Sequence, residues 1–231
     1  MPETILITGA NRGIGLELTR QFAAAGWRVF ATCRRLQQAP ELAAVAASNP
    51  QVSLHPLEVT DPESIRSLQQ ELGEVPLDLL FHNAGIIGSQ RQGFGEAEAE
   101  PWLQAFRVNS IAPLLLTQAF VDQVAASRRK LIAIMGTQMA SLADNRSGGY
   151  YLYRSSKAAA HMVAKCLAID LQPRGITVVV LHPGWVRTEM GGEAATLSPA
   201  ESARGLRQVI DGLSSQDSGR FFTYAGEELP W

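Results

Sequence analysis

The sequence predicts one α/β domain over residues 1–231, built on a doubly wound parallel sheet of about seven strands with helices on both faces. Short β-branched or apolar runs alternate with longer helical patterns along the whole chain. One of these runs, Val178–Leu181, is apolar throughout, which is typical of a strand buried on both faces of a sheet. A glycine-rich turn follows the first apolar run directly, and in doubly wound sheets such a turn lies at the ligand-binding edge.

The first half of the chain alternates between strand and helix patterns. It predicts strands over 4–8, 27–33, 52–57 and 77–81, helices over 13–25 and 40–48, and a third helix from 62. Gly26 ends the first helix, as glycine often does just beyond a last helical turn. Asp61 and Pro62 open the third helix as its N-cap and its first helical residue.

The second half of the chain contains the longest helical patterns. It predicts helices over 98–126, 150–171 and 199–213 and strands over 131–135, 176–181 and 220–224. Pro173 and Gly175 end the second of these helices. No linker, repeat or second domain interrupts the pattern, and the loop around 184–198 is expected to border the substrate.

Composition excludes several classes of partner. Hydrophobic residues make up 46% and charged residues 18% of the chain, and the net charge is -2, so no basic field is available for nucleic acid or an anionic membrane. Cys33 and Cys166 lie in separate apolar runs, which indicates neither a disulfide framework nor a metal site. With no signal peptide or membrane-length apolar run, we expect a cytoplasmic protein without a bound metal.

The glycine-rich turn predicts a dinucleotide site. It reads Thr8-Gly9-Ala10-Asn11-Arg12-Gly13-Ile14-Gly15, and glycines there let a pyrophosphate approach the N-terminus of the following helix. The second strand ends without the acidic residue that binds the ribose of NAD, and Arg34 follows it instead. Arg12 and Arg34 therefore favour NADP(H), because a guanidinium matches the oxygens of a 2′-phosphate. The alternative is that both arginines are only surface charges.

Tyr153 and Lys157 are the candidate proton-transfer pair. Four residues apart on a predicted helix, they lie on the same face. Reduction of a carbonyl needs a proton donor, and a nearby ammonium is expected to lower the phenol pKa from about 10. Tyr150 and Tyr151 have no lysine four residues further on. The spacing alone also fits an ordinary pair on a helix surface.

Several motifs occur in an order that resembles the short-chain dehydrogenase/reductase family from Thr4 to about Tyr224. They are Thr-Gly-x3-Gly-Ile-Gly, His82-Asn83-Ala84-Gly85, Asn109, Tyr153-x3-Lys157 and Pro183-Gly184-x-Val186-x-Thr188. Within that family, the 142–157 segment, the Pro183–Thr188 loop and Leu229-Pro230-Trp231 resemble the C-factor-like and Sniffer-like carbonyl reductases. The resemblance implies a Rossmann-type fold and a carbonyl reductase activity that uses NADP(H).

The resemblance also implies roles for individual residues. Lys157 would bind the nicotinamide ribose, and Asn109 would hold a water beside Lys157. The alternative for Asn109, which is locally unfavourable in an apolar helix and is followed there by Ser110 and Pro113, is a polar residue that bonds the backbone at a kink, and the two roles are compatible. The residues expected to bind the cofactor are Gly9, Asn11, Arg12, Gly13, Ile14, Gly15, Arg34, Glu58, Val59, Asn83, Ala84, Gly85, Tyr153, Lys157, Pro183, Gly184, Val186 and Thr188. An apolar substrate pocket is expected from Ile86, Ile87, Met139, Trp185 and Met190.

The chain departs from the family pattern at the serine that relatives carry just after the fifth strand. The segment here reads Ile134-Met135-Gly136-Thr137-Gln138. Ungapped counting from Asp144 places Thr137 at that position, and its hydroxyl can still polarise a carbonyl. Ser141 is the alternative, since its distance from Tyr153 along the chain is closer to the usual one. We favour Thr137 because it lies nearer the carboxyl end of the strand.

Three functions remain open at the level of sequence. The first is NADPH-dependent reduction of an aldehyde or ketone, or the reverse, with Tyr153 as general acid and base. The second is an NADP(H)-binding signalling or sensor protein of C-factor type, favoured by the missing serine. A sugar-nucleotide epimerase on the same fold is a third, although it normally needs a longer C-terminal region. The resemblance also implies a homodimer through the helices 98–126 and 150–171, and the natural substrate cannot be read from these residues.

Overall fold

The computed structural model describes residues 2–231, which form one seven-stranded sheet in the order β3-β2-β1-β4-β5-β6-β7. Every neighbouring pair of strands is parallel, so the predicted doubly wound fold is confirmed. The strands are β1 (Thr4–Ile7), β2 (Arg28–Cys33), β3 (Val52–Pro56), β4 (Leu79–His82), β5 (Leu131–Met135), β6 (Thr177–His182) and β7 (Phe221–Thr223).

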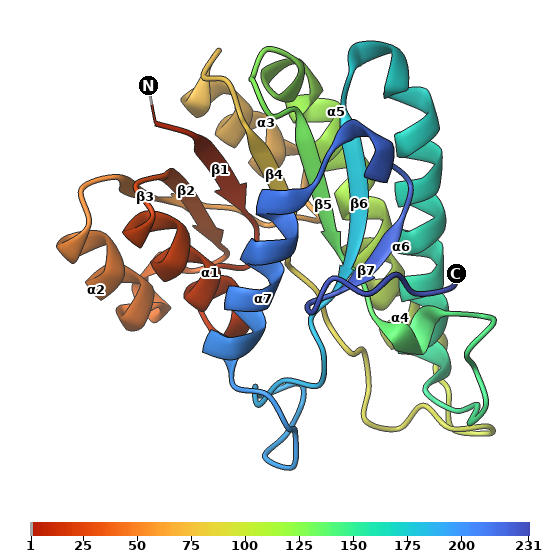
Figure 1. Ribbon diagram of the computed structural model, residues 1–231. Coiled ribbons are helices and arrows are strands. Elements are labelled where there is room, and N and C mark those ends of the chain that lie inside the picture. Colours follow the sequence, from red (N-terminus) through yellow and green to blue (C-terminus); the bar gives the residue numbers. More distant parts are fainter. Residues whose placement is uncertain (1) are drawn as a thin grey trace.

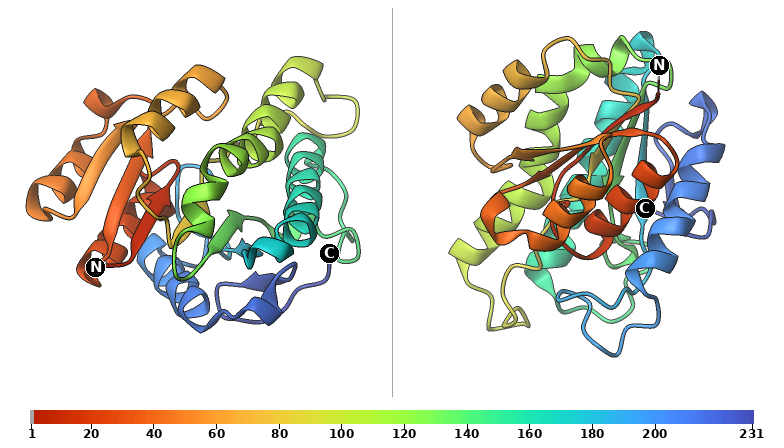
Figure 2. Two further views of the ribbon diagram at one scale, coloured as in Figure 1. Left: turned by 90° about the horizontal axis from the view of Figure 1, so that it is seen from above. Right: turned by 90° about the vertical axis from the view of Figure 1, so that its left-hand side faces the viewer.

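Helices cover both faces of this sheet (Figures 1 and 2). One face carries α1 (Gly13–Ala24), α2 (Pro40–Ser48) and α7 (Pro199–Gly212), and the other α3 (Pro62–Leu72), α5 (Ala112–Ala125) and α6 (Tyr151–Asp170), with α4 (Ala99–Phe106) against α6. Two apolar cores result, because successive side chains of a strand point to opposite faces. In β1, Ile5 and Ile7 join the core under α1, whereas Leu6 joins the core under α5.

The long helix predicted over 98–126 is interrupted. A π-helical turn over Arg107–Ile111 separates α4 from α5. Asn109 lies in this turn, and its amide bonds to the main chain of Ile86 and to Ser156, contacts outside its own helix. Single π-helical turns of this kind are frequent at functional sites.

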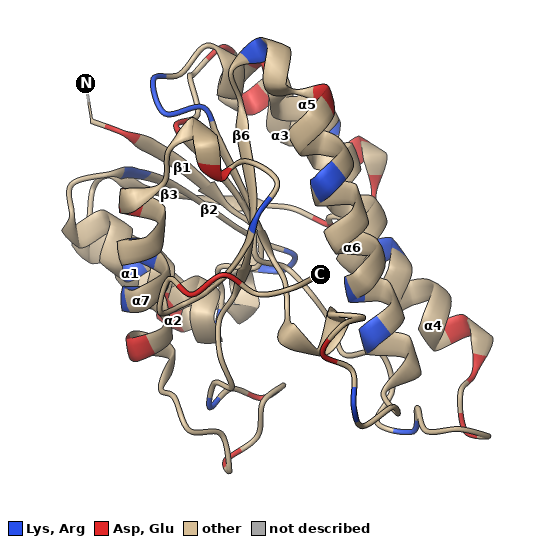
Figure 3. Cartoon of the chain, turned by 45° about the vertical axis from the view of Figure 1, so that its right-hand side comes forward, with Lys and Arg blue, Asp and Glu red and all other residues tan. Residues whose placement is uncertain are grey.

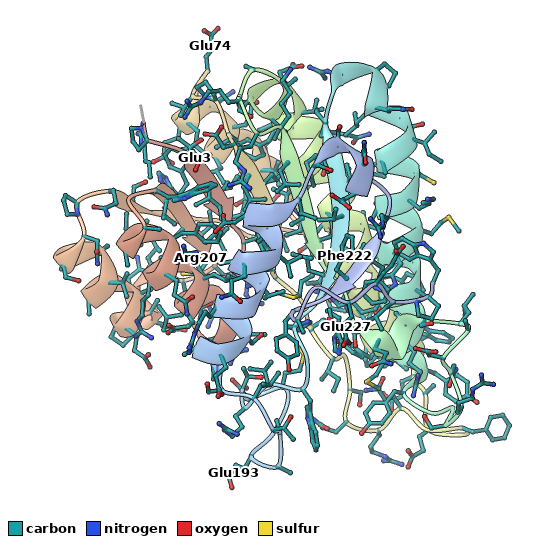
Figure 4. All side chains as sticks on the ribbon, in the orientation of Figure 1. Glu3, Glu74, Glu193, Arg207, Phe222 and Glu227 are labelled. Carbon is teal, nitrogen blue, oxygen red and sulfur yellow. The ribbon has the colours of Figure 1, made fainter. Side chains whose placement is uncertain are left out.

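The sheet reverses its direction of winding between β1 and β4. From there the chain runs outward to β2 and β3 on one side and to β5, β6 and β7 on the other. Ligands of such sheets bind at the carboxyl ends of the strands next to this switch point. The loop 184–198 extends from the carboxyl ends of the strands, and Glu193 lies near its tip in Figure 4.

Charged residues are spread over the described chain, and its helices are not of the membrane-spanning kind. Figure 3 shows basic and acidic residues scattered over helices and loops alike, in keeping with the net charge of -2. Between residues 2 and 231, no helix combines the length and the apolar character needed to cross a membrane.

Candidate active site

The glycine turn is packed so closely that Gly9 and Gly15 leave no room for a side chain. Gly9 has a φ of +68°, and a Cβ there would lie 3.0 Å from the Cα of Ala84. A Cβ on Gly15 would collide with the carbonyl oxygen of Gly9 and the amide of Asn83. The amide of Asn83 donates to the carbonyl oxygens of Thr8 and Gly9 at 2.9 Å. The side chain of Asn83 therefore holds the turn in place beside the end of β4.

A cavity of about 490 Å³ runs from this turn to Tyr153 and Lys157. Most of the predicted cofactor residues line it: Gly9, Asn11, Arg12, Gly13, Ile14, Gly15, Arg34, Glu58, Val59, Asn83, Ala84, Gly85, Tyr153, Lys157, Pro183 and Thr188. Gly184 and Val186 line a neighbouring cavity instead. We call the first cavity the cofactor cleft, because most of the predicted cofactor residues line it, at the carboxyl ends of the strands.

The two arginines predicted to select NADP(H) both lie in the cofactor cleft and remain largely exposed. Arg12 forms an ion pair with Glu189 of the loop after β6. Arg34 lies 4.0 Å from the carboxylate of Glu58, which accepts hydrogen bonds from the main chain and the hydroxyl of Thr60. Sequence reasoning missed Glu189, which no motif marks.

The neighbouring cavity, of about 660 Å³, meets the cofactor cleft at Tyr153. Four of the side chains predicted for the substrate pocket line it, namely Ile87, Met139, Trp185 and Met190. Ile86 lines the cofactor cleft instead. We call this second space the substrate cavity.

Helix α6 presents Tyr153 to both cavities. Gln92 holds the start of this helix, since its carbonyl oxygen accepts from Tyr151 N and its side chain from Tyr153 N, at 3.1 and 3.0 Å. Desolvation raises the pKa of Tyr153 to about 12, and a hydrogen bond with the Thr137 hydroxyl opposes that rise. The Tyr153 phenol is therefore fully protonated at neutral pH.

Lys157 is buried, and its ammonium donates to the carbonyl oxygen of Met135 at 2.7 Å. Burial lowers the pKa of Lys157 to about 8. The sequence argument expected this charge to lower the pKa of Tyr153. The structure differs, because desolvation of the phenol outweighs the opposing contributions.

The two candidates for the missing serine occupy different places. Thr137 lies in the substrate cavity beside Tyr153. Ser141 lines neither cavity of the described chain and is buried. Its hydroxyl donates to the main-chain oxygen of Trp231 and accepts from Asp144 N, both at 3.1 Å. Of the two candidates, only Thr137 lines a cavity that Tyr153 also lines.

Asn109 lies behind the site. Its side-chain oxygen accepts from Ile86 N, and its amide donates to Ile86 O and to Ser156 Oγ, all at 2.9 Å. A Cβ on Gly85 would lie 3.2 Å from the Asn109 oxygen and 3.3 Å from the Lys157 ammonium. Asn109 thus ties the loop after β4 to α6 close to Lys157, and its water-holding role stays a prediction.

Several residues of the substrate cavity were not predicted. They are Gln138, Asp144, Ser147, Tyr150, Arg154 and His182, among others. His182 ends β6, and within residues 2–231 its buried Nδ1 has no hydrogen-bond partner; burial lowers the pKa of His182 to about 4. Its position directly before Pro183 was the one available signal. Arg154 donates to Met139 O and Ser147 Oγ at 2.8 Å and so shapes the wall of the cavity.

Comparisons with known proteins agree with this geometry. A family model described as short chain dehydrogenase matches residues 3–197. C-signal of Myxococcus xanthus is 42% identical over 156 residues, which cover 68% of this chain and 93% of that protein. The NADPH-bound carbonyl reductase from chicken fatty liver is 35% identical with a TM-score of 0.93, covering 100% of this chain and 99% of that one. Carbonyl reductase Sniffer of D. melanogaster is 30% identical with a TM-score of 0.93, and the match covers 100% of both chains.

Proposed function

Because this chain belongs to the short-chain dehydrogenase/reductase family of oxidoreductases, we propose that it reduces an aldehyde or ketone to an alcohol with NADPH, or catalyses the reverse reaction. The position of Tyr153 carries the proposal. Its side chain lines both the cofactor cleft and the substrate cavity, and Thr137 lines the substrate cavity with it. A proton donor at such a junction is what hydride transfer to a carbonyl requires.

The residues of the cofactor cleft fit a phosphate-bearing dinucleotide. Gly9, Gly13 and Gly15 line the cleft without side chains at the N-terminus of α1, where a pyrophosphate would accept from main-chain N–H groups. Arg12 and Arg34 would pair with the 2′-phosphate, and Lys157 with the nicotinamide ribose. Bound NADPH supplies the hydride.

The protein's own groups supply the proton and orient the carbonyl. Tyr153, with a pKa of about 12, donates its proton to the alkoxide that develops on the substrate. The Thr137 hydroxyl donates its one hydrogen to the carbonyl oxygen and so polarises the carbonyl beside Tyr153. Lys157 would stabilise the phenolate that remains, because its side chain lies on the same face of α6 and lines the same cleft as Tyr153. Asn109 maintains the loop beside Lys157 and completes the proton relay.

Arg12 and Arg34 are expected to give the protein its preference for NADPH. Replacing either by alanine should weaken NADPH binding about ten- to a hundredfold, because a charged hydrogen bond contributes roughly 1.5–3 kcal/mol. NADH binding should stay within about twofold, since NADH lacks the phosphate that these guanidinium groups bind. Titration of both cofactors measures this, with Arg35→Ala as the matched control on the adjacent exposed arginine. Equal affinities of the unaltered protein for NADPH and NADH would overturn the assignment.

Replacing Thr137 is expected to lower kcat far more than replacing Ser141. Thr137→Val should lower kcat about 10²-fold through loss of a hydrogen-bond donor to the carbonyl, and Thr137→Ser should keep most activity. Ser141→Ala should cost at most about threefold, the effect of one modest hydrogen bond. Steady-state kinetics on one ketone separates the two, and the opposite ranking would move the role to Ser141.

A sensor function is the second candidate, favoured by the 42% identity to C-signal of Myxococcus xanthus. In that case NADP(H) binding would be the function and turnover incidental. A panel of aldehydes, ketones and quinones distinguishes the two candidates. Tight NADPH binding without consumption on any of them would favour the sensor.

Self-association belongs to the proposal as well. Large apolar side chains are exposed on or between the helices expected to form a dimer, namely Leu103, Ile111, Met162 and Ile169. Pairing these helices between two copies of the chain would remove that apolar surface from water.

A further inference from the structure

The segment after β7 returns across the sheet toward the active-site loop that follows β5. Thr223 N donates to Glu227 O and Leu229 N to Phe221 O, both at 2.8 Å, so the segment folds back on β7. Figure 4 shows Glu227 close to Phe222, and Figure 1 shows the C-terminal segment continuing to α6. Trp231 thereby reaches the underside of the loop 137–144.

The ring of Trp231 closes an aromatic cluster behind Thr137. It stacks on Phe221 with centroids 5.6 Å apart and meets His161 edge-on, also at 5.6 Å. His161 in turn lies 4.6 Å from Phe221. The His161 imidazole thus packs against the rings of both Phe221 and Trp231.

The position of His161 is transmitted directly to Thr137. The His161 Nε2 accepts from Thr137 N at 3.4 Å. Burial lowers the pKa of His161 to about 3, so the ring is neutral and this nitrogen is free to accept. A Cβ on Gly136 would collide with the His161 ring, which therefore lies directly against the backbone that precedes Thr137. A shift of the ring would remove the hydrogen bond to Thr137 N and the packing against Gly136.

The main chain of Trp231 holds the other end of the same loop. Its oxygen accepts from Ser141 Oγ and from Ala143 N, both at 3.1 Å. Ser141 Oγ also accepts from Asp144 N at 3.1 Å. Trp231 thus holds one end of the loop 137–144 directly, through its main chain, and reaches the other end only through the His161 ring. Trp231 lines neither cavity of the described chain.

We propose that Trp231 is a positioning residue, which holds the Thr137 hydroxyl against Tyr153 through the His161 ring at one end of the loop and through Ser141 and Ala143 at the other. This inference rests on the proposed function, because Thr137 must act in turnover for its position to matter. It assigns Ser141 to the support of the loop.

Trp231→Ala tests the proposal by separating kcat from cofactor binding. A displacement of about 1 Å in a catalytic group can cost roughly 10²-fold in rate, so we expect kcat to fall about ten- to a hundredfold. The Kd for NADPH should stay within about twofold, because Trp231, His161 and Phe221 do not line the cofactor cleft and this cluster meets it only at the backbone of Gly136. A loss in kcat without a loss in cofactor binding marks an interaction made only in the transition state. Trp231→Phe keeps an aromatic wall against His161 and should restore most of kcat.

Two controls exclude a general loss of stability. Leu229→Ala removes a side chain from the same segment that packs on the core under α5, so it should lower the Tm without lowering kcat. In the Thr137→Val background, Trp231→Ala should cause little further loss, since both changes remove the same interaction.

The outcomes separate the two proposals. If the unaltered protein consumes NADPH on a ketone but Trp231→Ala keeps kcat within about twofold, the positioning role is wrong and the proposed function stands. Full additivity with Thr137→Val, or an equal loss in Leu229→Ala, would also overturn it. If no carbonyl compound supports turnover by the unaltered protein, the proposed function fails first.

Discussion

Tyr153→Phe is expected to lower kcat for carbonyl reduction about 10²- to 10⁴-fold, the range that removal of a general acid produces. Phenylalanine fills the same space at the junction of the two cavities but has no proton to donate to the developing alkoxide. The loss should appear in kcat, whereas the Kd for NADPH should change little, because the hydroxyl acts on the reacting oxygen. NADPH consumption with a saturating ketone measures the first quantity and fluorescence titration the second.

Tyr151→Phe is the matched control for this change. Tyr151 lies two residues earlier, is exposed at the start of α6 and lines neither cavity of the described chain. Its replacement should leave kcat unaltered. If Tyr153→Phe turned over as fast as the unaltered protein, the assignment of the proton donor would be wrong and the sensor function would gain support.

Lys157→Met is expected to have opposite effects on activity and stability. Loss of the ammonium should lower kcat/KM about 10²- to 10³-fold, as removal of one electrostatic contact to the transition state does. The same change should raise the free energy of unfolding by about 1–3 kcal/mol, because an ammonium held by one carbonyl oxygen in a buried site carries a desolvation cost. Kinetics and denaturant unfolding on the same preparation measure both.

Lys165→Met controls for the loss of a lysine from α6. The Lys165 ammonium also donates to a main-chain oxygen, that of Gly219 at 3.1 Å, but Lys165 is exposed and outside both cavities of the described chain. Its replacement should leave kcat unchanged and should not stabilise the fold. A Lys157→Met protein that is less stable than the unaltered one would contradict the desolvation argument.

The pH dependence of stability gives an independent check on Lys157. Its pKa is about 8 in the folded protein, below its ordinary value of 10.5, so the unfolded chain holds this proton more tightly. The cost of burying the charge is fully present below pH 8 and disappears as the pH rises from 8 to 10.5. The stability gap between Lys157→Met and the unaltered protein should therefore narrow across that window, and a constant gap would refute the assignment.

The alternation of strands and helices could be predicted because it is encoded locally. The predicted ranges of α2 and β5 match the structure at both ends, and the other strands differ by a residue or two. Asn109, Ser110 and Pro113 are unfavourable inside the helix predicted over 98–126 and point to a kink there, although the pattern alone does not place the break. The π-helical turn contains Asn109, whose partners Ile86 and Ser156 are distant in sequence.

The sequence by itself determined the fold class, because the alternation of strand and helix patterns is encoded locally. It pointed to the glycine turn and to Tyr153 and Lys157 through the order of the family motifs, since a four-residue spacing alone also fits an ordinary helix surface. Only the tertiary structure decided where Thr137, Ser141 and Trp231 lie, since they meet through contacts between β5, α6 and the segment after β7. It also decided the sign of the pKa shift at Tyr153. Proximity to Lys157 is readable from spacing, but desolvation depends on what the whole chain packs around the phenol.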